Sequence, residues 1–278
     1  MRLYRFERLD HLLEMIRKGE VSFSHPSQWD DPYEICFLTA GHTVEHALVK
    51  GADGTYRGKA PRRADSSTAH ITYTNPYGQF VFAQCFVSDM QDSERLWLAA
   101  HSDGRVRWSI NAEPYLLALR NASKEKDVVL KGITYRPTDE VTRIHQEFVL
   151  QYLQPGADRS FEAWTRNVIG PFTTKRSEFR DEHEYRVIVI DKAHHARLRE
   201  TRTPPPPPMP PRLGHTKVSV PLAALLIEVT LPPQLEDVKV KECTANLRTA
   251  GFLGPVSQSS LYTPPILGTR TENPIVEP

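Results

Sequence analysis

Apolar residues at the start of the chain follow first a period of two and then a period of three to four. Leu3-Tyr4-Arg5-Phe6 predicts a short opening strand, in which one of Tyr4 and Arg5 faces the core and the other faces outward. A helix is predicted next from apolar residues at helical spacing, namely Leu9, Leu12, Leu13 and Ile16. Gly19 predicts the end of that helix, and Val21-Ser22-Phe23 predicts a second strand.

The same change of period recurs along the rest of the chain. Strands are predicted at Phe80–Phe86, Val106–Ile110, Val128–Tyr135, Leu225–Leu231 and in the apolar run that ends at Ile190. Helices are predicted near Glu94–His101, from Asn111 and Pro114 onward, at Thr138–Leu153, around Phe161–Ile169 and at Gln234–Ala250. Interleaved strands and helices without an internal repeat indicate one mixed α/β or α+β domain, and we predict the α+β class. We therefore predict a single mixed domain over residues 1–262, with a central, largely antiparallel sheet flanked by helices.

Three segments stand apart from this pattern. Residues 51–75 are polar and predict an exposed excursion. Residues 200–215 contain the proline run Pro204–Pro208, which must be extended; we interpret it as a semi-rigid loop inside the domain, with a ligand for SH3-type modules as the alternative. Residues 263–278 are rich in proline, threonine and glutamate and predict a flexible C-terminal tail.

Composition narrows the class of protein. The 278 residues are 39% hydrophobic and 25% charged, which is typical of a globular protein. Lys+Arg 35 against Asp+Glu 34 leaves a formal charge of +1, so net charge does not indicate nucleic acid as a partner, although a local basic groove stays open. Three separated cysteines, without a Cys-x-x-Cys pair, favour a reducing compartment. With no signal-peptide or transmembrane pattern, we expect a cytoplasmic protein with no membrane partner.

A dense group of charges precedes the apolar run that ends at Ile190. Glu182, Glu184 and Arg186 recur at a spacing of two, which predicts that they line one face of a strand. Two carboxylates and a guanidinium on one face suggest a polar site at the mouth of a sheet. The alternative is a solvated strand end that carries an ion pair.

Other candidate residues are dispersed along the chain. They are Tyr4 and Arg5 on the opening strand, Asp31 and Glu34 in an acidic and aromatic loop, Trp97 on a predicted helix, and Lys175 before the charged strand. No glycine-rich phosphate loop, Gly-x-Ser-x-Gly elbow or His-Glu-x-x-His motif is present, and the histidines are scattered, so we expect no metal site. The same residues could instead satisfy one another as a buried ion network without chemistry.

Several of these motifs occur in the order found in one bacterial family. Leu3-Tyr4-Arg5-Phe6, Trp29-Asp30-Asp31-Pro32-Tyr33-Glu34, Cys85-Phe86-x-Ser88, Leu96-Trp97 and Lys175 with Glu182-x-Glu184-Tyr185-Arg186 resemble the family catalogued as domain of unknown function 2971. The resemblance spans residues 3–262 and implies no reaction. The chain departs from the family pattern at Asp30, where Asn is usual, and at Phe179, where Trp is common. Ala99 and Ala100 also stand where an aromatic residue is usual.

A second resemblance does imply a reaction. A Tyr-Arg strand followed by a helix, a glycine stop and a short strand is similar to the opening of ADP-ribosyltransferase-like domains, some of which carry Glu-x-Glu at a strand. The resemblance implies NAD as the substrate, with Arg5 holding a phosphate or ribose and Tyr4 or Trp97 stacking near the nicotinamide. It also implies that Glu184 stabilises oxocarbenium-like charge at the ribose and that Glu182 orients the acceptor nucleophile.

The same resemblance leaves one detail open. Ser88 or Ser109 would supply the serine that such enzymes place between the arginine and the glutamates, and the sequence does not separate them. We also assign Asp31, Glu34, Lys175 and Arg186 to the binding of a small-molecule or nucleotide ligand. A compact bacterial enzyme of this kind would act as a toxin or an anti-phage effector.

Two alternatives compete with the NAD-consuming enzyme. Asp31, Glu34, Glu182 and Glu184 could bind Mg²⁺ through hard oxygen ligands in a nuclease or hydrolase, although Arg5 and Arg186 would repel the metal. A non-catalytic sensor or interaction module is the other alternative. Both enzymatic hypotheses require that the opening strand, Trp97 and the two glutamates converge.

Overall fold

The computed structural model describes residues 1–29, 42–50, 56–59, 69–73, 81–88, 96–97, 104–153, 169–192 and 214–262. Its strands are β1 (Arg2–Arg8), β2 (Glu20–Ser24), β3 (His42–Lys50), β4 (Tyr56–Lys59), β5 (Ala69–Tyr73), β6 (Val81–Ser88), β7 (Arg105–Asn111), β8 (Lys126–Gly132), β9 (Thr134–Arg136), β10 (Thr174–Arg176), β11 (Glu184–Asp191), β12 (His215–Ser219), β13 (Leu226–Leu231) and β14 (Val256–Gln258). Its helices are α1 (Leu9–Lys18), α4 (Ala112–Ala122), α5 (Thr138–Leu153), α8 (Leu222–Leu225) and α9 (Asp237–Thr249), with 3₁₀ turns η1 (Pro26–Gln28) and η3 (Ser177–Glu182).

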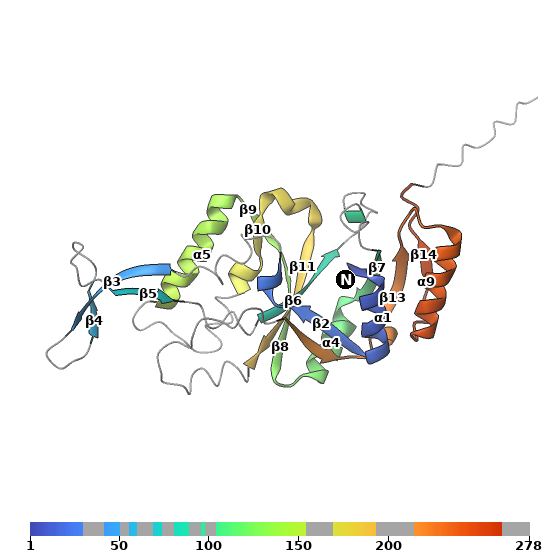
Figure 1. Cartoon of the computed structure of the whole chain (residues 1–278), viewed down its shortest axis with the longest axis horizontal. Coiled ribbons are helices and arrows are strands. Elements are labelled where there is room, and N and C mark those ends of the chain that lie inside the picture. The colour runs from blue at the N-terminus through green and yellow to red at the C-terminus, as the bar shows by residue number, and fades with distance from the viewer. Residues whose placement is uncertain are drawn as a thin grey trace, which may run out of the picture.

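A nine-stranded, mostly antiparallel sheet forms the centre of the molecule (Figure 1). One path through it runs β12-β2-β6-β1-β7-β13-β14, and β11 lies on the other side of β6 with β8 beyond it. The predicted α+β class and the central antiparallel sheet in a single domain are confirmed. A small parallel pair, β10-β9, and a separate sheet, β4-β3-β5, complete the described strands.

Local sequence explains the buried face of helix α1 and the position at which this helix ends. Helix α1 carries Leu12, Leu13, Met15 and Ile16 on its buried face. Gly19 follows in the left-handed conformation, with φ of 60°, and its N–H donates to the carbonyl of Ile16. The predicted strand, helix and strand at the start of the chain are confirmed by β1, α1 and β2.

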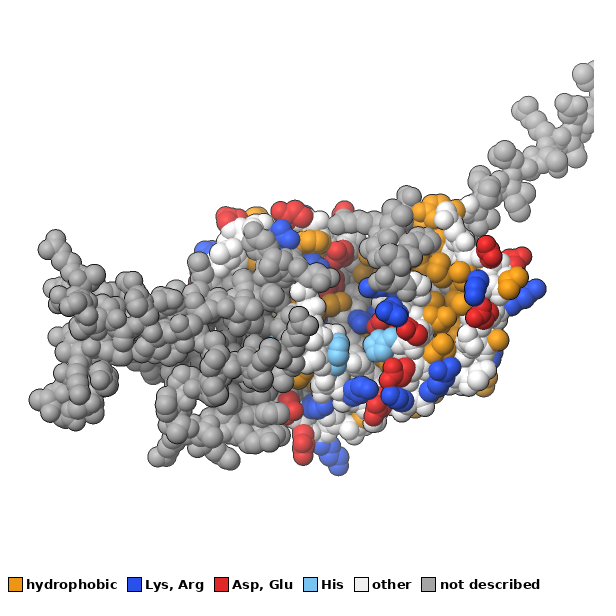
Figure 2. Space-filling model, in the orientation of Figure 1, with side chains coloured by type: hydrophobic (Ala, Val, Ile, Leu, Met, Phe, Trp, Pro, Cys, Tyr) orange, Lys and Arg blue, Asp and Glu red, His pale blue; other side chains and the backbone are white. Residues whose placement is uncertain are grey.

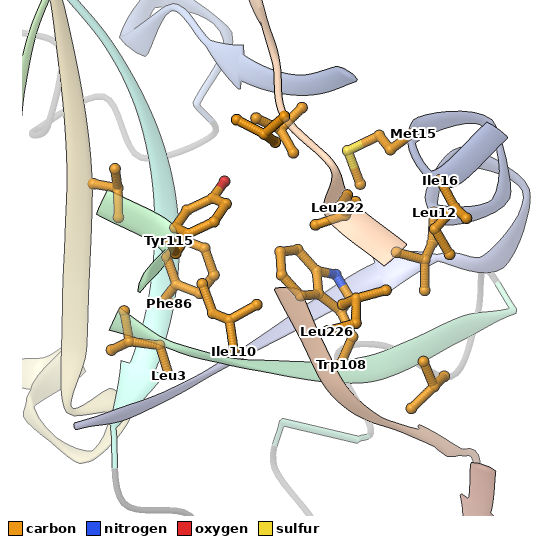
Figure 3. Close-up of a cluster of buried hydrophobic side chains, with 14 of the residues drawn as sticks. Leu3, Leu12, Met15, Ile16, Phe86, Trp108, Ile110, Tyr115, Leu222 and Leu226 are labelled. Atoms are coloured by element: carbon orange, nitrogen blue, oxygen red, sulfur yellow. The ribbon is translucent and has the colours of Figure 1, made fainter. Parts of the chain in front are cut away.

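Helices α1, α4, α8 and α9 cover one face of the large sheet. Each contributes to one hydrophobic cluster, which Figure 3 shows between the sheet and the helices. Strand β7 reaches it through Val106, Trp108 and Ile110, which are at most 1% exposed. The alternate residues Arg105, Arg107 and Ser109 therefore lie on the opposite face, which we call the outer face.

Strand β6 has three neighbours. Along one edge it pairs with β11 from Val81 to Val87. Along the other edge β1 pairs with it only at Val87 and Ser88, whereas β2 pairs with it at Ala83. We call this divergence of β1 and β2 along β6 the fork.

Some sequence predictions differ from the structure. The single strand predicted at Val128–Tyr135 is two strands, because Ile133 interrupts β8 before β9, which joins the separate parallel pair. Strand β3 was not predicted, and the excursion at 51–75 contains β4 and β5, which pair with β3. Most of the helices predicted near Glu94–His101 and Phe161–Ile169, and the whole of segments Pro204–Pro211 and 263–278, lie outside the described residues.

The remaining helix and strand predictions agree closely with the structure. Helix α5 covers the predicted Thr138–Leu153, and α9 ends before Gly251, whose φ is 104°. No helix in the part of the chain described here is long and apolar enough to cross a membrane.

Candidate functional site

Strand β11 begins with opposite charges that are buried together. Oε1 of Glu184 accepts a hydrogen bond from Nε of Arg186 at 2.6 Å, and Oε2 accepts one from Nζ of Lys175 at 3.0 Å. The side chains of Glu184 and Arg186 are 5% and 1% exposed. Nη1 of Arg186 also donates to the carbonyl oxygen of Phe172 at 2.7 Å. Opposite charges and hydrogen bonds thus offset the cost of burying these ions.

The pKa of Glu184 is set by its neighbours. Burial by itself raises this pKa because it disfavours the charged carboxylate. The charges of Arg186 and Lys175, with hydrogen bonds from Arg186 and the Cys85 thiol, outweigh burial and lower the pKa from 4.5 to about 2. Glu184 is therefore a fixed negative charge at neutral pH and not a proton donor.

Glu182 lies outside the strand that was predicted to contain it. It ends η3, and β11 begins at Glu184. His183 between them has a φ of 43°, in the left-handed region, so the alternation of faces does not extend across it. Lys175 nevertheless joins the two carboxylates, because its Nζ also donates to Oε2 of Glu182 at 2.7 Å. Glu182 is 24% exposed and is the more accessible of the two glutamates.

Aromatic rings lie against the cations of this group. The guanidinium of Arg186 lies 4.2 Å from the ring centroid of Trp29, and Nζ of Lys175 lies 4.7 Å from that of Phe179. Both arrangements are cation–π contacts. Lys175, Glu182, Glu184 and Arg186 form what we call the ion network.

Tyr135 is a site residue that the sequence analysis missed. Its hydroxyl oxygen accepts a hydrogen bond from the backbone N–H of Glu184 at 2.9 Å. Burial raises the pKa of Tyr135, and the nearby charge of Glu184 also raises it, so the hydroxyl keeps its proton at neutral pH. With its oxygen held by an N–H, the hydroxyl can donate its proton to a ligand beside the ion network. The only sequence signal for Tyr135 is that it ends the strand predicted at Val128–Tyr135, just before the helix predicted at Thr138–Leu153.

Five residues from five adjacent strands form a row across the outer face. The pairs Glu228↔Ser109, Ser109↔Tyr4, Tyr4↔Val87 and Val87↔Glu184 are directly opposite in β13, β7, β1, β6 and β11. Directly opposite residues lie on the same face of a sheet. Tyr4 and Glu184 therefore share the outer face, two strand spacings or roughly 10 Å apart. We call this set the five-strand row.

Arg5 and Ser88 lie on the other face. Arg5 is opposite Trp108, a core residue, and Ser88 is opposite the buried Leu3. The side chain of Arg5 donates to Oε2 of Glu7 and to the carbonyl oxygen of Cys85. The structure thus brings Ser109, and not Ser88, beside Tyr4, and it separates Arg5 from the face that carries Glu184.

Trp97 belongs to the outer face as well. It is fully buried, and its ring meets that of Phe6 edge-on at 5.0 Å between centroids. Phe6 shares a face with Tyr4 because the two are separated by one residue in β1. Asp31 and Glu34 lie outside the described residues, so the structure does not place them.

The face that carries Arg5 holds a second polar group. Glu7 lies between Arg5 and Nδ1 of His11, which is 3.2 Å from Oε1 of Glu7. Burial raises the pKa of Glu7, but hydrogen bonds and charge from His11 and Arg5 outweigh it and lower the pKa to about 2. Figure 2 shows histidine side chains among acidic and basic ones on one face of the molecule.

The ion network is poorly suited to a divalent metal. Its two carboxylates are already bridged by the ammonium group of Lys175, which occupies the position between them. Among the described residues, no group of three His, Cys, Asp or Glu side chains could hold a metal ion.

Comparisons with known proteins do not establish a family or an activity for this chain. No protein-family model matches the chain, so the resemblance to domain of unknown function 2971 rests on its motifs, and no curated protein matches it. DarT from Thermus sp. 2.9 in complex with NAD+ is 10% identical, with a TM-score of 0.32, and 93% of this chain and 94% of that chain are covered. DarT from the same source in complex with ADP-ribosylated ssDNA is 12% identical, with a TM-score of 0.34 and 93% of each chain covered. At these TM-scores neither a shared family nor a shared activity follows.

Proposed function

We propose that this chain is an ADP-ribosyltransferase-like enzyme that consumes NAD. The observation that carries the proposal is the five-strand row, which puts the ring of Tyr4 and the ionised carboxylate of Glu184 on one face. The sequence resemblance assigns these two residues to NAD, and their common face is what such an assignment requires. Trp97 and Phe6 add aromatic surface to the same face.

A fixed negative charge suits the proposed reaction. Cleavage of the bond between nicotinamide and ribose leaves positive charge on the ribose ring, and nicotinamide departs with the electron pair as a neutral molecule. Because Glu184 stays ionised at neutral pH, its field can stabilise that charge as it develops. Arg186 and Lys175 hold the carboxylate in place, so little reorganisation is needed.

The second half of the reaction needs a nucleophile. Water or an acceptor group attacks the ribose carbon, a new bond forms there, and the nucleophile gives up one proton. Glu182 is the more exposed carboxylate and lies beside Lys175, so we assign it to orient the nucleophile and accept that proton. The hydroxyl of Tyr135 supplies a hydrogen-bond donor at the same place.

Release of nicotinamide from NAD tests the proposal directly. The purified full chain is incubated with NAD, alone and with protein or single-stranded DNA as acceptor, and free nicotinamide is measured. Glu182→Gln, on the more accessible carboxylate, is expected to lower the rate at least tenfold while the protein stays folded. Asp181→Asn, one residue away and exposed, is the matched control and should retain the rate. Absence of nicotinamide release with every acceptor would contradict the proposal.

A role in toxicity or phage defence belongs to the same proposal. Expression of the wild-type chain in bacteria should slow growth and deplete NAD, and Glu182→Gln should relieve both effects. Toxicity that survives Glu182→Gln would separate the biological role from this chemistry.

A second candidate function is favoured by one observation. Both carboxylate oxygens of Glu184 accept hydrogen bonds from buried cations, which is also what a purely structural network requires. A non-catalytic binding module is therefore the alternative. It predicts that variants of the ion network change stability and that no NAD-dependent activity exists.

A further inference from the structure

The outer face carries a cationic group beside Tyr4 that does not belong to the ion network. The guanidinium carbons of Arg2 and Arg107 lie 5.4 Å and 5.5 Å from the ring centroid of Tyr4. Arg2 is separated from Tyr4 by one residue in β1, and Arg107 comes from the neighbouring strand, where it is opposite Phe6. The ring of Tyr4 therefore has a guanidinium group on each side along its strand.

Buried polar residues hold both guanidinium groups in place. Nε and Nη2 of Arg2 donate to Oγ of Ser109 at 3.1 Å and 2.9 Å, and Nη2 of Arg107 donates to Oγ1 of Thr230 at 3.1 Å. Ser109 and Thr230 are 0% and 3% exposed. Nη2 of Arg2 also lies 2.8 Å from Oε1 of Glu228. Side chains that are already ordered lose little entropy when a ligand binds.

A β-bulge brings Glu228 to this group. The register of β13 against β7 shifts between Leu226 and Glu228, so Leu226 faces the core while Glu228 faces outward. Bulges of this kind re-aim a side chain, and they are frequent beside functional sites. Glu228 thereby orients Arg2.

Donors remain for a ligand. Among the residues described, neither Nη1 of Arg2 nor the hydroxyl of Tyr4 has a hydrogen-bond partner, and the side chain of Arg2 is 36% exposed. Arg2 and Arg107 bring positive charge beside the aromatic ring, and Glu228 is the carboxylate that the described residues place against Arg2. Guanidinium donors bind phosphate oxygens through charge-assisted hydrogen bonds, and Nη1 of Arg2 carries two N–H groups for this purpose.

We propose that Arg2, Arg107 and Tyr4 form a binding site for the diphosphate of a nucleotide, with Ser109 and Thr230 orienting the two arginines. The five-strand row puts Tyr4 two strand spacings, roughly 10 Å, from Glu184, and strand β7, which carries Arg107, three spacings or roughly 14 Å from it. Because the side chains of the site extend from these strands toward the ligand, one dinucleotide can reach both places. The inference rests on the proposed function, and it assigns the diphosphate to Arg2 and Arg107 on the outer face in place of Arg5.

Titration with ADP-ribose tests the site without any reaction. ADP-ribose carries the diphosphate but no bond to nicotinamide, so calorimetry on the full chain measures binding alone. Arg2→Gln and Arg107→Gln are each expected to weaken binding about tenfold. Arg8→Gln removes the same charge from an exposed position on the outer face of β1, where Arg8 pairs with Asp10, and should bind like wild type. Arg107→Lys keeps the charge but loses the planar group, and it is expected to bind ADP-ribose with intermediate affinity. This variant tests the site if Arg107→Gln does not fold.

Three results would overturn the site. The first is a wild-type chain that does not bind ADP-ribose. The second is that the arginine variants bind ADP-ribose as tightly as wild type does. The third is that the arginine substitutions weaken binding of a single-stranded DNA oligonucleotide but not binding of ADP-ribose. The proposed function fails separately. If ADP-ribose binds through Arg2 and Arg107 but NAD releases no nicotinamide, the site stands and the NAD-consuming activity does not. If nicotinamide is released and the arginine variants leave KM for NAD unchanged, the activity stands and the site does not.

Discussion

Nη1 of Arg5 donates a hydrogen bond to the carbonyl oxygen of Cys85 at 3.0 Å, at the fork where β1 and β6 stop pairing. Diverging strands leave backbone groups without partners in the ladder, and buried backbone groups of this kind are costly when unpaired. Gln84 does the same on the other side of the fork, where its Nε2 donates to the carbonyl oxygen of Ser22 at 2.7 Å. Side chains thus replace the missing ladder, which gives Arg5 a structural role.

Removal of one hydroxyl should weaken the fork. The hydroxyl of Tyr115 donates to Oε1 of Gln84 at 2.6 Å, and both residues are at most 1% exposed. Tyr115→Phe leaves this buried oxygen without a donor, and we expect a loss of about 1–3 kcal/mol in the free energy of unfolding, measured by urea denaturation. In a Gln84→Met background the same substitution should cost much less, because the orphaned acceptor is gone. Equal losses in both backgrounds would contradict this explanation.

The two glutamates of the ion network should differ in their effect on stability. Glu184→Gln leaves Arg186 buried beside a neutral amide, and we expect it to lower the free energy of unfolding by about 3–5 kcal/mol. Glu182→Gln removes the more exposed partner of Lys175 and should cost about 1 kcal/mol or less. Chemical denaturation of both variants at neutral pH measures the difference. Similar losses would show that burial does not distinguish the two carboxylates.

Stability should fall in acid through two carboxylates. The pKa values of Glu7 and Glu184 are lowered from 4.5 to about 2 in the folded chain. Each therefore stabilises the fold above pH 4.5, and this stabilisation is lost as the pH falls through about 2. Between pH 4.5 and pH 2 the free energy of unfolding of Glu7→Gln should therefore fall by about 3 kcal/mol less than that of the wild type. Glu113→Gln, which removes a carboxylate from the exposed surface of α4, is the control variant for the same substitution.

Tyr135 should affect activity and stability together. Tyr135→Phe removes the acceptor of the Glu184 N–H and the donor beside the ion network, so we expect a loss of about 1 kcal/mol and a nicotinamide release rate at least tenfold lower. Tyr185→Phe removes a hydroxyl from the residue next to Glu184, on the other face of β11, and should retain the rate. If both variants retain it, Tyr135 has no part in the reaction.

Local features of the fold were predictable because their causes are local. The period of apolar residues and the left-handed Gly19 define α1, and the alternation of β7 is visible in Arg105-x-Arg107-x-Ser109. The start of β11 was predicted wrongly, because His183 takes its left-handed conformation in contact with another strand: Ser88 N–H donates to its carbonyl oxygen. Nothing near position 183 in the sequence specifies that contact.

The candidate site was predictable only in part. The association of Glu184 with Arg186 follows from their spacing, and Lys175 was included through its place in a motif. The five-strand row depends on the register of four strand pairs, which is fixed by tertiary packing and not by local sequence. The alternation in β7 could have indicated Arg107, but the strands that bring Arg2 and Glu228 to it are distant in sequence.

The position of β6 has a consequence for synthesis of the chain. This strand is complete by residue 88, but β11, its partner from Val81 to Val87, begins only at Glu184. A nascent or truncated chain that stops before this point presents a row of unpaired N–H and C=O groups along β6, and strand edges of this kind template association with other chains. Chains cut before residue 184 should therefore self-associate, whereas loss of the segment beyond residue 262 leaves every partner of β6 in place.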